Sequence, residues 1–166
     1  SIAGIGNGNL LPAGPLREDL SELKNYNAVF INGKKNINLI KEIKKNNKNI
    51  KIFSGNYYLK NKLQFNKNLR YLAFCSIGTP ESFLNLLQQN NIKVEKKIIF
   101  PDHYNYKFSD IIKIMRIADN NHLKIVTTEK DYVKIKRFKK LKTKIADIDL
   151  QVDKYSNFKK FLLSNL

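Results

Sequence analysis

The sequence predicts an α/β protein built on a largely parallel sheet. Short apolar segments, each about the length of one buried strand, alternate with longer segments in which apolar residues recur every three or four positions. Gly, Asn and Pro residues mark the turns between the two kinds of segment. With 166 residues and 42% apolar side chains, the chain can bury an ordinary core. Regular alternation of this kind is typical of strands that pair in parallel and are crossed by helices.

The first half of the chain contains three predicted strands and three predicted helices. The strands are expected at 28–31, 50–53 and 70–75. Pro15 with the helical spacing of Leu16, Leu20 and Leu23 predicts a short helix whose first turn includes Arg17 and Glu18. A Lys-rich helix is expected over Ile37, Ile40 and Ile43, and another after Thr79, where an N-cap, a proline and an acid follow one another. Residues 57–69 give no clear pattern.

The second half continues the alternation. Strands are expected at 94–100, 123–126 and 145–148, and a terminal helix at 155–163. Ser109 is predicted to cap a helix whose apolar stripe comprises Ile111, Ile112, Met115 and Ala118. Thr128 is predicted to cap the next helix, with Asp131 three residues on in a capping-box arrangement.

Charge and cysteine content restrict the possible functions. The net charge is +17, which attracts nucleic acid, anionic lipid or nucleotide phosphates. Only four of the basic residues are arginines, so a solvated lysine-rich surface is the simpler interpretation. The single Cys75 excludes a disulfide framework and a cysteine-based zinc site. Residues 1–13 lack the basic start and apolar stretch of a signal peptide, so we expect a cytosolic protein.

Ligands of parallel α/β sheets bind where strands end and helices begin. The candidate loops are therefore 76–79, 101–106, 127–131 and the N-terminal Gly/Pro segment. In the second of these loops His103 adjoins Asp102, and a histidine beside a carboxylate suits a general base. The alternative is a loop histidine bonded to backbone. The other histidine, His122, is expected to have only a capping role at a helix end.

Two further groups could contact phosphates or metal. The start of the helix after Thr128 favours an anion, and Lys130 adds positive charge, although capping alone explains Thr128 and leaves Glu129 and Lys130 open. Arg17 can contact a phosphate and Glu18 can bind Mg²⁺ directly or through water. The alternative for this pair is solvent exposure at a helix start.

Four blocks resemble the tetraacyldisaccharide 4′-kinase family, the lipid A 4′-kinases of Gram-negative bacteria. The long block over residues 6–18 is the most specific, and 100–104 and 127–131 follow in the expected order with a looser match over 74–83. Ser76 and Tyr104 depart from the family pattern, where Gly and His are more usual.

The resemblance implies a kinase that transfers the γ-phosphate of ATP, with Mg²⁺, to the 4′-hydroxyl of tetraacyldisaccharide 1-phosphate, forming lipid IVA. It also implies a P-loop NTPase-like enzyme of two α/β/α sandwich lobes. The P-loop lobe is not in this sequence, so we expect the C-terminal half: residues 1–24 as an inter-lobe segment with a short helix and 25–166 as the α/β/α domain. Such a chain is expected to be inactive alone.

The family motifs also imply roles for individual residues. His103 and Asp102 would be catalytic, Glu18 would help hold Mg²⁺, and the remaining matches would bind phosphate or substrate: Arg17, Thr128, Glu129 and Lys130. The enzyme would bind peripherally to the cytoplasmic face of the bacterial inner membrane, with no nucleic acid partner. The competing hypothesis is a non-catalytic basic α/β module that binds nucleic acid or anionic lipid, which the charge favours and the scarcity of arginine weakens.

Overall fold

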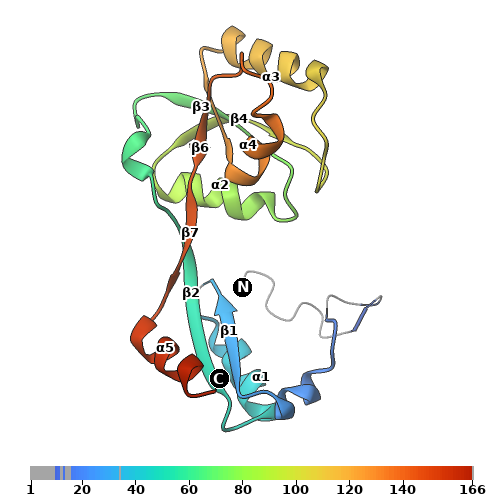
Figure 1. Cartoon of the computed structure of the whole chain (residues 1–166), viewed down its shortest axis with the longest axis vertical. Coiled ribbons are helices and arrows are strands. Elements are labelled where there is room, and N and C mark those ends of the chain that lie inside the picture. Colours follow the sequence, from blue (N-terminus) through green and yellow to red (C-terminus); the bar gives the residue numbers. More distant parts are fainter. Residues whose placement is uncertain (1–9, 12, 14–15, 34, 166) are drawn as a thin grey trace. The chain divides into compact units, whose positions relative to one another are not determined.

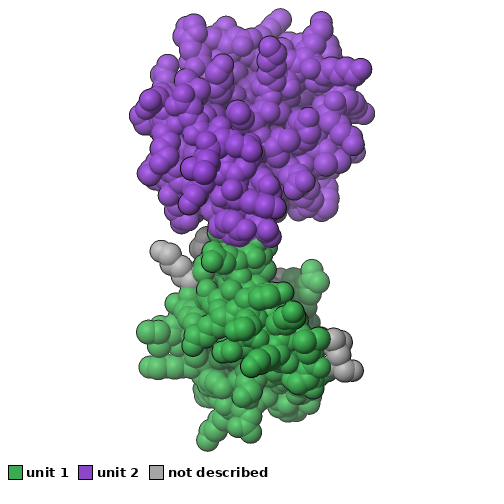
Figure 2. All heavy atoms as spheres, turned by 60° about the vertical axis from the view of Figure 1, so that its left-hand side comes forward, with its two compact units in different colours: residues 1–57, 150–166 green, residues 58–149 purple. Residues whose placement is uncertain are grey.

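The computed structural model describes residues 10–11, 13, 16–33 and 35–165. The chain divides into two compact units, coloured separately in Figure 2: unit 1 comprises residues 1–57 and 150–166, and unit 2 comprises residues 58–149. The chain therefore passes from unit 1 to unit 2 and back again. The expected boundary near residue 24 stays a prediction.

Unit 2 contains a four-stranded sheet in the order β4-β3-β5-β6 (Figure 1). Its strands are β3 (Arg70–Cys75), β4 (Lys93–Ile99), β5 (Lys124–Thr128) and β6 (Thr143–Ala146). All three neighbouring pairs are parallel, which confirms the predicted class of fold. The register sets Cys75 opposite Ile99 and Phe74 opposite Thr127. The carboxyl ends of β4, β3 and β5 thus meet at one edge of the sheet.

Helices cover both faces of this sheet. The helices are α2 (Pro80–Gln89), α3 (Phe108–Asn120) and α4 (Glu129–Ile135), and a short 3-10 helix, η2 (Lys62–Gln64), precedes β3. Alternate residues of β3 serve opposite faces, because strand side chains have a period of two. Tyr71 and Ala73 pack in one cluster with Phe83 of α2, whereas Leu72 packs in another with Ile111 of α3. Unit 2 is therefore a three-layer α/β/α lobe.

Unit 1 is built on the three-stranded sheet β1-β2-β7. Its elements are β1 (Ala28–Asn32), β2 (Lys51–Leu59), β7 (Ile148–Val152), the helices α1 (Ile37–Asn46) and α5 (Tyr155–Leu163), and the 3-10 helix η1 (Leu20–Asn25). Ile31, Ile43 and Ile50 form its buried core. The ring of Phe53 on β2 lies 5.0 Å from Phe158 and 5.1 Å from Phe161 of α5.

Several predicted element boundaries are wrong in informative ways. The first helix begins at Leu20 as a 3-10 helix, because the carboxylate of Asp19 caps it by accepting from Ser21 N. Arg17 and Glu18 therefore precede the helix instead of lying in its first turn, and Pro15 lies outside the described residues. The expected strand at 145–148 is two strands, β6 and β7.

Helix caps show a second kind of difference. The helix expected to start at Ser109 begins at Phe108 with Lys107 as N-cap, and Lys107 N donates to the carboxylate of Asp110 at 2.8 Å. Thr79 is the N-cap of α2, as predicted, but makes no capping hydrogen bond with its side chain. The strand at 70–75 and the helix at 155–163 are confirmed to the residue. In the described part of the chain, no helix is long and apolar enough to cross a membrane.

Candidate functional site

The predicted loops of unit 2 meet at the carboxyl edge of its sheet. Ser76 follows β3, residues 100–107 follow β4, and Thr128 ends β5. Because β3 lies between β4 and β5, its loop is the neighbour of both others. The structure therefore brings the candidates Asp102, His103 and 128–130 to one edge.

Asp102 and His103 occupy a tight turn that the backbone closes. Tyr104 N donates to Pro101 O at 3.2 Å, and His103 N donates to Oδ1 of Asp102 at 2.9 Å. The His103 Nε2 atom lies 3.8 Å from Oδ2 of Asp102, and the two side chains are 75% and 46% exposed. The carboxylate thus organises the turn while the imidazole stays open to solvent.

A comparison of the backbone angles of His103 and His122 shows that the backbone of His103 is strained. Both residues have positive φ, 57° and 53°. His122 follows α3, where Leu123 N donates to Ala118 O at 2.8 Å, so its left-handed conformation is an ordinary helix ending. This confirms the predicted capping role. His103 instead lies in a turn after β4 and follows no helix, so no helix ending accounts for its left-handed backbone, which costs a non-glycine residue about 1 kcal/mol or more.

Aromatic side chains support the turn from below. The rings of Phe100 and Tyr104 stack with centroids 4.8 Å apart, and Tyr104 lies 5.6 Å from Tyr106. The hydroxyl of Tyr104 donates to the carboxylate of Asp110 at 3.1 Å. Tyr106 is buried, and its ring meets that of Phe74 edge to face. The His103 loop is therefore anchored on both the sheet and α3.

Beneath this edge lies a buried polar group, which we call the Asp131 cluster: Ser76, Thr128, Asp131 and Lys134. Asp131 accepts from Ser76 N at 3.0 Å, from the Ser76 hydroxyl, and from the Thr128 hydroxyl at 2.8 Å. Lys134 Nζ donates to Ser76 Oγ at 2.7 Å and lies 3.4 Å from Asp131 Oδ1. Ser76 and Asp131 are both 0% exposed. A buried carboxylate is tolerated here because several donors satisfy it.

The environment of this cluster shifts three pKa values. Burial alone raises the pKa of Asp131, but hydrogen bonds from Ser76 and Thr128 outweigh it and hold the pKa below its ordinary value. Burial, together with the charge of Asp131, raises the pKa of the Cys75 thiol to about 11. Burial likewise raises the pKa of Tyr106, whose hydroxyl has no hydrogen-bond partner within the described residues. The cluster thus holds the Asp131 carboxylate in its ionised form beside the ammonium group of Lys134.

The segment 127–131 contains both residues with structural contacts and residues exposed on the surface. Thr128 caps α4 by accepting from Asp131 N at 3.1 Å, which confirms the predicted cap. The carboxylate of Asp131 does not return to the Thr128 backbone as a full capping box would, because it reaches across to Ser76. Glu129 and Lys130 are exposed at the same edge. The binding roles of Thr128, Glu129 and Lys130 stay predictions.

Arg17 and Glu18 belong to unit 1, whereas the other candidates belong to unit 2. Both side chains are exposed, and the Glu18 carboxylate accepts from the Tyr26 hydroxyl. That hydrogen bond raises the pKa of Tyr26. The hydroxyl thus holds the Glu18 carboxylate through its Oε2 atom on the surface of unit 1.

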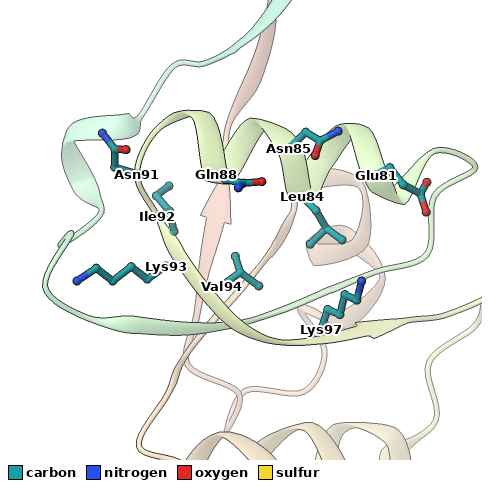
Figure 3. Close-up of a pocket in the computed structure, with 9 residues that line it drawn as sticks. All are labelled: Glu81, Leu84, Asn85, Gln88, Asn91, Ile92, Lys93, Val94 and Lys97. Carbon is teal, nitrogen blue, oxygen red and sulfur yellow. The ribbon is translucent and has the colours of Figure 1, made fainter. Parts of the chain in front are cut away.

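A groove lies elsewhere on unit 2. It has a volume of about 670 Å³ and runs between α2 and the edge strand β4 (Figure 3). Glu81 and Asn85 of α2 and Lys93 and Lys97 of β4 line it. None of the candidate residues contributes to it, so the groove and the candidate site are separate.

The comparisons decide the family. The whole of residues 2–166 matches the family model described as tetraacyldisaccharide-1-P 4′-kinase. The chain belongs to the tetraacyldisaccharide 4′-kinase family. This confirms the resemblance inferred from the four sequence blocks.

Curated members of this family include close relatives from two bacterial genera. The chain is 41% identical over 138 residues to the tetraacyldisaccharide 4′-kinase of Pelagibacter ubique (strain HTCC1062), which is 82% of this chain and 44% of the relative. It is 36% identical over 141 residues to that of Rickettsia bellii (strain OSU 85-389), covering 79% of this chain and 40% of the relative. The chain therefore spans less than half the length of these relatives.

A solved structure supports the fold. LpxK from Aquifex aeolicus, crystallised in complex with ATP, matches 95% of this chain and 48% of its own with a TM-score of 0.57 and 20% identity. At that identity the likeness establishes the family fold and no residue role.

The family motifs direct attention to exposed residues and miss the buried ones. Ser76, Tyr106 and Lys134 were not predicted as site residues, although all three lie against the loops that carry the motifs. The departure at Ser76 was the available signal, because a hydroxyl at the end of a buried strand needs a partner.

Proposed function

We propose that this chain is the part of a tetraacyldisaccharide 4′-kinase that supplies the histidine of the active site. The complete enzyme would transfer the γ-phosphate of ATP to the 4′-hydroxyl of tetraacyldisaccharide 1-phosphate and release lipid IVA. Family membership over residues 2–166 supports the reaction class. Because the chain spans under half of its relatives, we expect it to be inactive without the remainder of the enzyme.

The Asp102–His103 turn is the observation that carries this proposal. Its imidazole is exposed at the carboxyl edge of a parallel sheet, where such folds place their chemistry. A neutral imidazole there can accept the proton of a hydroxyl, or orient a carboxylate that accepts it. The Asp102 carboxylate lies 3.8 Å from the ring nitrogen Nε2 and accepts from His103 N, so it fixes the turn that presents the ring.

Phosphate and metal binding are assigned to the other motif residues. Arg17 would neutralise phosphate charge with its planar guanidinium, and the ammonium group of Lys130 would bind phosphate or substrate. Mg²⁺ would neutralise charge on the transferring phosphate. Glu18 fits that ion, since one or two carboxylates with phosphate oxygens suffice for Mg²⁺. In the described residues no group of three or more His, Cys, Asp or Glu side chains could hold a metal ion.

The substrate explains the surface charge. A tetraacylated disaccharide phosphate partitions into a membrane, so we propose that the enzyme acts as a peripheral protein on the cytoplasmic face of the inner membrane. A net charge of +17 favours an anionic lipid surface, to which each nearby Lys contributes roughly 1 kcal/mol.

Kinetics of the complete enzyme test the catalytic role. We expect His103→Ala to lower kcat by about 10²-fold or more with little change in KM, because general acid–base groups contribute on this scale. His122→Ala is the matched control, since it also replaces a histidine at positive φ. An unchanged kcat for His103→Ala, or an equal loss for both variants, contradicts the proposal.

A further inference from the structure

The Asp131 cluster joins loops that the catalytic proposal treats separately. The carboxylate of Asp131 accepts hydrogen bonds from Ser76, the first residue after β3, and from Thr128, the last residue of β5. Both are buried and well satisfied, so the positions of the two strand ends are coupled through one side chain.

A first path leads from this cluster to Asp102. Two residues after Ser76, Gly78 passes directly under the Asp102 carboxylate: a Cβ at this position would lie 3.2 Å from its Oδ2 atom. The adjacent backbone is joined directly, because Phe100 N donates to Cys75 O at 2.9 Å. The Ser76 loop and the Asp102–His103 turn are therefore neighbours, so that a displacement of the first can move the second.

A second anchor of this loop is Tyr106, which ends the loop carrying His103. Its buried ring meets that of Phe74, two residues before Ser76, edge to face with ring centroids 5.7 Å apart. On the other side, Arg137 donates to Tyr106 O at 2.9 Å. The loop is thus held on one side by β3 and on the other by the segment after α4.

We propose that Asp131 is a positioning residue that holds the Asp102–His103 turn in its strained conformation through Ser76. A left-handed histidine persists only where its surroundings over-determine it, and the Asp131 cluster supplies that constraint. The proposal rests on the proposed function for its relevance to catalysis. Asp131 itself, being 0% exposed, does not touch substrate.

Nuclear magnetic resonance of the 166-residue chain tests this directly. The chain has two histidines, so ring ¹H–¹³C correlations give one set of signals for His103 and an internal control from His122. We expect Asp131→Asn to shift and broaden the His103 ring and backbone signals while those of His122 stay unchanged. Ser76→Ala, which removes only the hydroxyl link, should produce a smaller displacement of the same signals.

Thr128→Ala is the matched structural control. It removes the cap of α4 and one bond to Asp131, but leaves both bonds from Ser76 to Asp131 in place. Its His103 signals should therefore match the wild type. Unmoved His103 signals in folded Asp131→Asn, or equal displacement in Thr128→Ala, overturn the proposal. If Asp131→Asn does not fold, Ser76→Ala decides alone. The readout is the state of His103 and not turnover, so failure here is distinct from failure of the proposed reaction.

Discussion

The carboxylate of Asp131 holds both the backbone N–H and the hydroxyl of Ser76, although 55 residues separate the two in the chain. Asp131 belongs to a motif whose exposed members, Glu129 and Lys130, are the natural candidates for ligand binding. Its own part in the motif is to bind one strand end to another. The buried Asp131 and the exposed Glu129 and Lys130 therefore make different contacts although they occupy three consecutive positions.

The stability of unit 2 should depend on acid through this carboxylate. The folded pKa of Asp131 lies below the ordinary 3.8, so the folded form binds a proton less readily than the unfolded chain. Its stabilisation is therefore complete above the ordinary value and is lost as the pH falls towards the folded value. We expect Asp131→Asn to lower the free energy of unfolding by about 3 kcal/mol at neutral pH. The gap from the wild type should narrow between roughly pH 5 and pH 2. Urea titrations across this range measure it, and a gap that does not change with pH contradicts the assignment.

Removing the hydroxyl of Tyr106 should not harm the fold. That hydroxyl is buried without a hydrogen-bond partner in the described residues, so Tyr106→Phe deletes an uncompensated polar group. We expect the free energy of unfolding to rise by up to about 1 kcal/mol. Tyr71→Phe is the matched control: the buried Tyr71 hydroxyl donates to Asn66 O and accepts from Asn66 N, so its loss should destabilise. Urea unfolding of the two variants side by side should give opposite signs.

Unit 1 should not accept a methyl group at Gly55. A Cβ there would lie 2.7 Å from Gln151 O and 2.9 Å from Cζ of Phe30. Since the first neighbour is backbone, strands β2 and β7 would have to separate. We expect Gly55→Ala to lower the free energy of unfolding by about 3 kcal/mol. The loss should be measured as faster amide hydrogen exchange in unit 1, with exchange in unit 2 unchanged. Wild-type exchange in β1 and β2 would show that the sheet relaxes without cost.

Gly78→Ala should affect chemistry more than stability. The new Cβ would meet one side-chain oxygen, Oδ2 of Asp102, at 3.2 Å, which the carboxylate can relieve by moving a few tenths of an ångström. In the complete enzyme we expect kcat to fall about tenfold with KM little changed, because small misplacements of reacting groups are costly. The unfolding midpoint should stay near that of the wild type. A large loss of stability with normal kcat would place the importance of Gly78 in the fold alone.

Local pattern was sufficient where a segment explains itself. The strand at 70–75 is a continuous apolar run on a central strand, and the helix at 155–163 has aromatic residues at helical spacing that pack on Phe53. The helix after Lys107 was misplaced because a serine suggested a cap, whereas the carboxylate of Asp110 caps the preceding backbone N–H from inside the first turn.

The candidate site was likewise predictable only where its residues are neighbours in the chain. That Asp102 and His103 form one unit at a strand end follows from their position in the chain. That His103 is left-handed does not, since it depends on the Pro101–Tyr104 turn. The departure at Ser76 indicated that its hydroxyl needs a partner, but it did not identify Asp131, because capping already explained Asp131 and the two residues lie 55 positions apart.

The division of the chain has a consequence for its synthesis. Unit 2 is one continuous segment of the chain, whereas the sheet of unit 1 is completed only by β7. Phe53 packs on Phe158, and Ser54 donates to Asp153, which follows it by 99 residues. On the ribosome, unit 2 emerges whole and can fold while unit 1 still exposes its apolar face. The nascent chain therefore exposes the apolar face of unit 1, which is prone to aggregate, until α5 leaves the exit tunnel. A premature stop after residue 149 would leave unit 2, which contains His103, complete and unit 1 without most of β7 and without α5.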